Sequence, residues 1–286
     1  MMRGLAVAST LIVVLIALAL FMRSKPILAL KPLTTLLFST AWHPSRGEFG
    51  FLAFIAGTLW VTLVASFIAI PVCILASIYL SEYADKRLRE WIGPFIDILA
   101  GIPSVVYGMW GVLVIVPLVK NIIAPLFGGY SAGYSVLAGG LVLAVMISPV
   151  IIHISVEVLR TVPSDLKQAS LALGATKWET IKFVVMKRAM PGMIAASVLG
   201  LSRAFGETIA VMMVVGNVAR IPRTVFDPAY PLPALIANNY GEMLSIPLYD
   251  SGLLFAALLL LLVVIYFNVV SKMILSGSKW SLYYNG

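Results

Sequence analysis

The segment that decides the fold of this chain is residues 160–192, which read RTVPSDLKQASLALGATKWETIKFVVMKRAMPG. It is the longest polar interruption between apolar runs that are long enough to cross a lipid bilayer. Within it, Ser164 provides a capping hydroxyl for a helix start, and Gly174 indicates a helix end. Thr176 and Glu179 then form a T-x-x-E capping box that opens a second helix. The segment therefore predicts two amphipathic helices that meet at a bend between membrane spans.

These two helices are expected to carry apolar side chains on one face. Leu166, Ala169, Ser170 and Leu173 recur at helical spacing along the first helix, and Trp178 lies on the apolar face of the second. An exposed apolar face normally implies a partner protein. The alternative is a solvated hairpin that binds nothing.

The composition of the whole chain is that of a membrane protein. Of its 286 residues, 61% are hydrophobic and only 11% are charged, which is too few charged side chains to cover a soluble domain of this length. The formal net charge of +8 comes mostly from residues beside the ends of apolar runs, so it does not indicate a nucleic-acid surface. The single cysteine, Cys73, lies inside an apolar run, so neither a disulfide framework nor a metal site is expected.

Six apolar runs are long enough to span a membrane, which predicts an all-α polytopic membrane protein. They cover residues 5–22, 51–80, 93–119, 135–158, 191–217 and 251–275. The first run competes with a signal peptide, but its length and the lack of a small-x-small cleavage site before Arg23 favour an uncleaved span. With the amino terminus inside, most loop Lys and Arg residues are cytoplasmic, as the positive-inside rule requires. Both termini and residues 160–192 are then cytoplasmic, and the Pro-rich segment 219–250 is a stiff outer loop.

Two charged residues lie inside the fifth apolar run. Arg203 is twelve residues past Pro191, which places it about 18 Å along a helix, near the middle of the membrane. Charge at that depth is costly unless it is paired or faces a wet cavity, so it indicates a transport pathway. Glu207 follows one turn later and is expected to neutralise Arg203 when the site is empty. A purely structural ion pair is the alternative.

The third apolar run contains an interruption at Gly101, Pro103 and Ser104. Pro103 lacks an N–H group, so the helix is expected either to kink there or to break and restart. A restarted helix would aim its free N–H groups and the Ser104 hydroxyl at the centre of the membrane, as an anion site requires.

Several of these segments resemble a known family. The sequence Gln168-Ala169-Ser170, followed after three residues by Gly174, resembles the E-A-A-x-x-x-G signature of permease subunits of ATP-binding-cassette importers, with Gln and Ser in place of Glu and Ala. Residues 82–84 (EYA), 99–108 (LAGIPSVVYG), 200–211 (GLSRAFGETIAV) and 215–217 (VGN) are similar to the phosphate-importer permeases of the PstC type.

This resemblance implies a MetI-like, type I importer core that moves phosphate by alternating access. It implies a substrate path with Arg203, Glu207, Ser104, Pro103 and Thr208. Leu166, Gln168, Ala169, Ser170, Leu173, Gly174 and Trp178 are then the residues that meet the ATPase.

Residues 1–50 are expected to form the first span and an outer loop, 51–275 the permease core with a cytoplasmic coupling loop at 159–192, and 276–286 a cytoplasmic tail. The implied partners are a second permease subunit of the PstA type, two ATPase subunits of the PstB type, an extracytoplasmic phosphate-binding protein of the PstS type and membrane lipid. No nucleic acid and no cofactor are expected.

The chain has no G-x-x-x-x-G-K-[ST] motif, so it is not expected to be an enzyme, and ATP hydrolysis is assigned to the partner ATPases. Two alternatives stay open. One is a permease for another oxyanion, such as sulfate or molybdate, and the other is an ion-coupled secondary transporter.

Overall fold

The computed structural model describes residues 2–241, 246 and 248–283 of the chain. Six helices in this part are long and apolar enough to cross a membrane, which confirms the predicted all-α, six-span fold class. They are Leu11–Leu30, Leu52–Tyr83, Ser104–Leu126, Val136–Arg160, Lys177–Gly206 and Tyr249–Val270.

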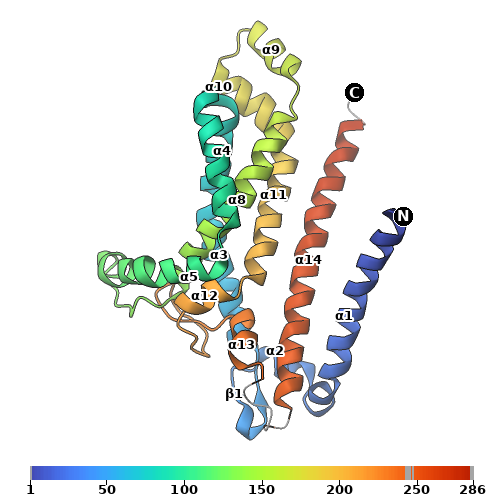
Figure 1. Ribbon diagram of the computed structural model, residues 1–286, viewed down its shortest axis with the longest axis vertical. Helices are drawn as coiled ribbons and strands as arrows, with labels where there is room; N and C mark the ends of the chain where they lie inside the picture. Colours follow the sequence, from blue (N-terminus) through green and yellow to red (C-terminus); the bar gives the residue numbers. More distant parts are fainter. Residues whose placement is uncertain (1, 242–245, 247, 284–286) are drawn as a thin grey trace.

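The long helices form a bundle with two helices beside it (Figure 1). These helices are α1 (Met2–Leu30), α3 (Leu52–Ile78), α4 (Lys86–Gly101), α8 (Val136–Arg160), α11 (Met186–Gly206) and α14 (Tyr249–Tyr283). The shorter helices are α2 (Leu33–Phe38), α5 (Ser104–Trp110), α6 (Val116–Leu118), α7 (Ala124–Leu126), α9 (Ser164–Ala172), α10 (Lys177–Glu179), α12 (Ile209–Val214) and α13 (Leu232–Asn239).

Wider π-helical turns continue several of these helices instead of ending them. They are η2 (Tyr79–Tyr83) after α3, η3 (Gly111–Ile115) and η4 (Val119–Ile123) between α5 and α7, and η5 (Thr180–Val185) between α10 and α11. A small antiparallel hairpin of β1 (Trp42–His43) and β2 (Glu48–Phe49), joined by the 3-10 turn η1 (Pro44–Arg46), lies at the opposite end of the molecule from α9 (Figure 1).

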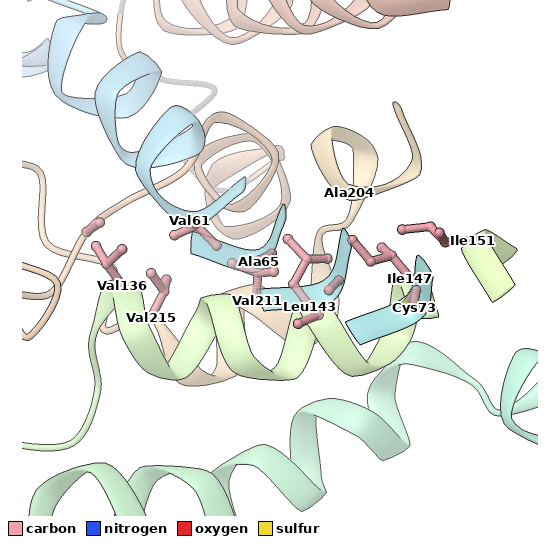
Figure 2. Close-up of a cluster of buried hydrophobic side chains, with 13 residues drawn as sticks. Val61, Ala65, Cys73, Val136, Leu143, Ile147, Ile151, Ala204, Val211 and Val215 are labelled. Atoms are coloured by element: carbon pink, nitrogen blue, oxygen red, sulfur yellow. The ribbon is translucent and has the colours of Figure 1, made fainter. Parts of the chain in front are cut away.

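The core of the bundle lies between α3 and α8. Figure 2 shows side chains such as Val61 and Ala65 of α3 facing Leu143 and Ile147 of α8. Gly140 of α8 permits this close approach, because a Cβ atom at that position would overlap Val64. The two helices therefore pack as one unit along their length.

Helix α14 lies between α11 and α1 (Figure 1). The last turn of α1 and the first turn of α14 are joined by a hydrogen bond in which the Ile27 N–H donates to Ser251 Oγ over 3.2 Å. The Trp42 ring meets the rings of Phe51 at 5.4 Å and Phe54 at 4.9 Å, and this aromatic cluster joins the hairpin to α3. The beginning of α1 and the end of α14 point toward the end of the molecule that carries α9 and α10 (Figure 1).

The third apolar run, residues 93–119, is broken at Pro103, which is one of the two outcomes that its sequence left open, and the spanning helix begins only after the break. Helix α4 ends at Gly101, Ile102 and Pro103 are extended, and a new apolar helix covers Ser104–Leu126. The break occurs because Pro103 cannot donate to the preceding turn, and its ψ of 143° redirects the chain. Helix α5 consequently runs across the direction of α4 (Figure 1). Pro103 is the N-cap of α5 and not part of its first turn.

Other boundaries also differ from the prediction. The second helix of the coupling loop continues through Pro191 into the fifth span, so Lys177–Gly206 is one helix. The outer segment 219–250 is not extended throughout, because it contains α13. Helix α14 continues beyond residue 275 to Tyr283, through most of the predicted tail. Residues 242–245 and 247 of that outer segment, and residues 284–286 of the tail, lie outside the described residues.

Candidate functional site

The first element of the site is the break between α4 and α5. Pro103 is exposed, and Ser104 is the half-buried first residue of α5. One turn into α5, the buried Tyr107 hydroxyl donates a 2.7 Å hydrogen bond to the Leu99 carbonyl oxygen near the end of α4. Because this bond crosses the break, it fixes the direction in which α5 leaves α4.

The second element is a break in the fifth predicted span, residues 191–217, where one continuous helix was expected. Helix α11 ends at Gly206, Glu207 is extended with a ψ of 124°, and Thr208 precedes α12. The Thr208 hydroxyl donates to the Gly206 carbonyl oxygen over 3.3 Å, which satisfies one of the carbonyl groups that the end of α11 leaves free. Two of the predicted path residues, Glu207 and Thr208, therefore lie on an irregular segment and not on a helix.

The two breaks lie close together because α5 packs against α12. A Cβ atom at Gly108 of α5 would come within 3.1 Å of the Ala210 Cα atom and within 2.5 Å of Met213 Sδ. Only glycine fits at this contact without displacing a neighbour. The structure thus brings the predicted residues Pro103 and Ser104 into the same region as Glu207 and Thr208.

Arg203 lies in the last turn of α11 and is exposed on the surface of the described chain. It lies in the neighbourhood of Tyr107 of α5. The neighbouring Ser202 accepts a hydrogen bond of 2.9 Å from Asn268 of α14, so α14 covers one side of this turn and leaves Arg203 accessible. The guanidinium group is therefore not enclosed by the helices of its own chain.

The expected ion pair between Arg203 and Glu207 is wrong. Among the described residues, the oppositely charged side chains whose N and O atoms lie within 4.0 Å of each other do not include Arg203 and Glu207. The prediction assumed that both residues lie on one helix, but the helix ends between them, and the extended backbone at Glu207 removes the i, i+4 relationship.

The coupling loop has the two-helix form that its sequence predicts. The Thr176 hydroxyl accepts from the Glu179 N–H over 3.3 Å, and the Glu179 carboxylate accepts from the Thr176 N–H over 2.8 Å, which confirms the capping box. Gly174 ends the first helix in the left-handed region with a φ of 87°. Helix α9 begins after Pro163 without a side-chain cap, so the predicted role of the Ser164 hydroxyl is wrong.

Most of the predicted coupling residues are exposed on this loop. Ser170 differs, because its hydroxyl lies 2.9 Å from the buried Thr180 hydroxyl and so faces η5, at the start of the helix that follows the loop. The exposed residues are Leu166, Gln168, Ala169, Leu173, Gly174 and Trp178.

One continuous helix joins the coupling loop to the arginine. The segment Lys177–Gly206 has 30 residues and begins at the loop. At 1.5 Å per residue it is roughly 45 Å long. The coupling loop and Arg203 therefore lie at opposite ends of the same helix.

A third polar group, which the sequence did not reveal as a pair, lies between α4 and α8. Asp97 Oδ1 is 3.8 Å from His153 Nδ1, and both side chains border a cavity of about 110 Å³. Arg160 and Glu157, 3.2 Å apart, also line this cavity. Only the packing of α4 on α8 brings Asp97 and His153 together, so no sequence spacing could have indicated the pair. No group of three or more His, Cys, Asp or Glu residues in the described ranges is arranged to hold a metal ion.

Comparison with known proteins agrees with this architecture. Residues 73–277 match the family described as "Binding-protein-dependent transport system inner membrane component". The phosphate transport system permease protein PstC of Xylella fastidiosa (strain 9a5c) is 38% identical over 252 residues, which cover 83% of this chain and 77% of that protein. A probable ABC transporter permease, YqgH of Bacillus subtilis (strain 168), is 40% identical over 76% of this chain and 71% of its own length.

Among solved structures, a chain of the MetNI methionine ABC transporter in an inward-facing conformation has a TM-score of 0.56 and 22% identity, and the match covers 78% of this chain and 93% of that one. This similarity confirms the predicted MetI-like fold. The chain belongs to the inner membrane components of binding-protein-dependent transport systems, and within them to the PstC-like permeases that its motifs predicted.

Proposed function

We propose that this chain is a permease subunit of an ATP-driven phosphate importer and forms one half of the path across the membrane. The observation that carries the proposal is the position of Arg203, a charged side chain left accessible at the end of α11 and beside the break in the third predicted span. The similarity to PstC permeases makes phosphate the first substrate to test.

The chemistry of these residues suits a tetrahedral oxyanion. The planar guanidinium group of Arg203 offers parallel N–H donors to two phosphate oxygens. Because phosphate at neutral pH keeps at least one O–H group, an ionised Glu207 can accept a hydrogen bond from it, whereas sulfate has no O–H group to donate. Ser104 and Thr208 add hydroxyl groups near the same breaks, and Pro103 maintains the first break.

Glu207 does not neutralise Arg203 directly, and this has a consequence for the mechanism. A guanidinium group without that pair stays available to an incoming anion and does not first have to release a carboxylate. In this proposal, Glu207 acts on the substrate and not on the arginine.

The energy enters through the coupling loop. The exposed apolar side chains of Leu166, Leu173 and Trp178 suit a cleft on a cytoplasmic ATPase subunit. Two such ATPases, a second permease subunit and an extracytoplasmic phosphate-binding protein complete the importer in this proposal. Both termini then lie in the cytoplasm, in accordance with the positive-inside rule.

The test is uptake of radiolabelled phosphate by the assembled complex in vesicles. We expect Arg203→Ala to abolish ATP-dependent uptake, and Glu207→Gln to reduce uptake and weaken the preference for phosphate over sulfate. Arg23→Ala, which removes an exposed arginine on α1, is the control and is expected to leave both quantities unchanged. Normal uptake by the Arg203 variant would refute the role of this residue.

Two further outcomes would favour the alternatives. Transport of sulfate or molybdate in preference to phosphate would identify another oxyanion as the substrate. Phosphate movement under a proton gradient, in vesicles that contain this chain but no ATPase, would favour a secondary transporter.

A further inference from the structure

A nearly buried ion pair joins the coupling loop to the end of the second span. Lys167 Nζ of α9 lies 2.7 Å from Glu82 Oε1 in η2, and the two residues are 85 positions apart in the chain. The Glu82 side chain is only 8% exposed, and that of Lys167 is 28% exposed. The Ser81 hydroxyl donates to the same carboxylate oxygen over 3.2 Å.

The burial of this pair sets it apart from the other ion pairs near the loop. Lys86 and Glu90 are 4.0 Å apart and their side chains are 90% and 62% exposed, so water screens their attraction. Removing one member of a buried pair, in contrast, leaves the other charge without compensation. Loss of Lys167 therefore removes the cationic partner of a carboxylate that is almost shielded from solvent.

The turn that carries Glu82 is itself held firmly. The Arg89 guanidinium group of α4 donates to the carbonyl oxygens of Leu80, Ser81 and Ala84 over 3.1, 3.0 and 3.3 Å. These are free carbonyl groups at the end of a helix, which a cationic side chain stabilises. The carboxylate is thus presented from a fixed position at the junction of η2 and α4.

The same turn also contacts the second helix of the loop. Lys177 Nζ lies 4.5 Å from the centre of the Tyr83 ring, within the range of a cation–π interaction. Glu82 and Tyr83 therefore contact the loop on both sides of Gly174. The Ser170 and Thr180 hydroxyls, 2.9 Å apart, hold α9 against η5.

We propose that the Lys167–Glu82 pair is a positioning contact that makes α3 follow the coupling loop when the ATPase moves it. Helix α9 has no buried residue of its own, so it depends on such polar contacts to transmit force. Through Glu82 the movement reaches α3, and through the core shared by α3 and α8 it reaches the rest of the bundle (Figure 2). The helix Lys177–Gly206 packs on α3 and α8 as well, and the ion pair adds a direct connection from α9 to the end of α3.

This inference rests on the proposed function, and its test separates the two. The complete importer is reconstituted in vesicles with both ATPases and the binding protein, and phosphate uptake and ATP hydrolysis are measured in the same sample. We expect Glu82→Gln and Lys167→Met to lower the phosphate imported per ATP hydrolysed by roughly fivefold or more, the lower end of coupling between distant sites. Hydrolysis itself should persist, because the apolar surface of the loop is unchanged.

Two further variants distinguish coupling from stability. Lys167→Arg keeps the positive charge and should retain the ratio, and the reversed pair Glu82→Lys with Lys167→Glu should recover part of it. Glu90→Gln, in the exposed pair with Lys86, is the matched control and should have no effect. If Lys167→Met fails to assemble, Glu82→Gln carries the test, because it leaves unpaired the more exposed Lys167 and not the shielded carboxylate.

An unchanged ratio in both single variants would overturn the proposal. So would a parallel fall in uptake, hydrolysis and assembled complex, which indicates that the pair only stabilises the fold. Failure of the unmodified complex to import phosphate with ATP would instead refute the proposed function.

Discussion

The Tyr107 hydroxyl and the Leu99 carbonyl oxygen are joined by a 2.7 Å hydrogen bond across the break between α4 and α5. Tyr107 is only 6% exposed. Its side chain therefore connects the two helices on either side of the break at Pro103. A change in the angle between α4 and α5 has to stretch or break this bond, so Tyr107 is placed to report on the state of the path.

Tyr107→Phe is expected to weaken the connection without disturbing the packing. The substitution removes only the hydroxyl, so the Leu99 carbonyl loses a partner, at a cost of about 1 kcal/mol. Thermal unfolding of the purified complex should shift to a slightly lower temperature, and phosphate uptake should fall. Tyr130→Phe, at a highly exposed position, should change neither quantity. Equal behaviour of the two variants would show that the bond across the break has no role.

Gly108→Ala is expected to push α5 away from α12. The new methyl group meets the Ala210 Cα atom at 3.1 Å, which a change of side-chain rotamer cannot relieve. Overpacking of this kind costs about 1–3 kcal/mol. The measurement is again the unfolding temperature, combined with uptake. Gly101→Ala is the matched control, because a Cβ atom there has no neighbour within 4 Å. If both alanine variants are equally stable, the contact between α5 and α12 can accept a methyl group at residue 108.

The number of spans and the coupling loop could be predicted because both depend on local patterns. Apolar runs of sufficient length specify spanning helices whatever their neighbours are. The capping box at Thr176 and Glu179 and the helix end at Gly174 likewise need only a few consecutive residues, and all three are present in the structure. The two-helix form of the loop was therefore predicted correctly.

The break after α11 and the charged pairs were harder to predict. Glu207 and Arg203 have the spacing of a helical pair, and a single glycine between them, Gly206, is the only local sign that α11 ends there. The pairs Lys167–Glu82 and Asp97–His153 join residues that are far apart in the sequence. Only tertiary packing brings them together, so one sequence without structure contains no local sign of them.

Substitution of Gly174 tests how strictly the bend of the coupling loop depends on its backbone. At a φ of 87°, an L-amino acid with a Cβ atom costs about 1–2 kcal/mol, although the surrounding space is open. Gly174→Val should therefore reduce ATP-dependent uptake more than Gly174→Asn, because asparagine tolerates left-handed backbone angles. Uptake by the two variants at equal amounts of complex in the membrane is the measurement. The same loss for Asn as for Val would point to the side chain, and not the backbone angle, as the cause.

The turn at Asp227, between α12 and α13, is expected to lose stability only in acid. Burial acts to raise the pKa of this carboxyl group, but hydrogen bonds from the Arg223 and Thr224 N–H groups and the charge of Arg220 outweigh burial and lower the pKa below its ordinary value of about 3.9. Because the pKa is lower in the folded state, the stabilisation is complete above the ordinary pKa and is lost as the pH falls through the folded value.

Hydrogen exchange at the Val136 amide checks this prediction, because that N–H donates to the Asp227 carbonyl oxygen over 2.9 Å. Protection relative to the Asp227→Asn variant should be greatest at neutral pH and should decline as the carboxylate is protonated. The Asn variant keeps an acceptor for the two N–H groups but has no charge to titrate. A difference between the two proteins that does not depend on pH would contradict the assignment.

The exposed apolar side chains of the coupling loop give the last prediction. Leu173 is 90% exposed and Trp178 is 52% exposed, although both lie on a loop that the positive-inside rule places in the cytoplasm. Leaving such groups in water is unfavourable, and aromatic anchors commonly supply much of the binding energy of an interface.

We expect Trp178→Ala to lower the affinity for the ATPase subunit by about 2 kcal/mol or more, and Leu173→Ala to have a smaller effect. Co-purification of the ATPase with the permease measures the loss. Phe67→Ala removes an aromatic ring that is 84% exposed from α3, within a predicted membrane span, and should leave the ATPase bound. Retention of the ATPase by the Trp178 variant would mean that the ATPase binds another part of the loop, where Leu166 and Leu171 of α9 are also exposed.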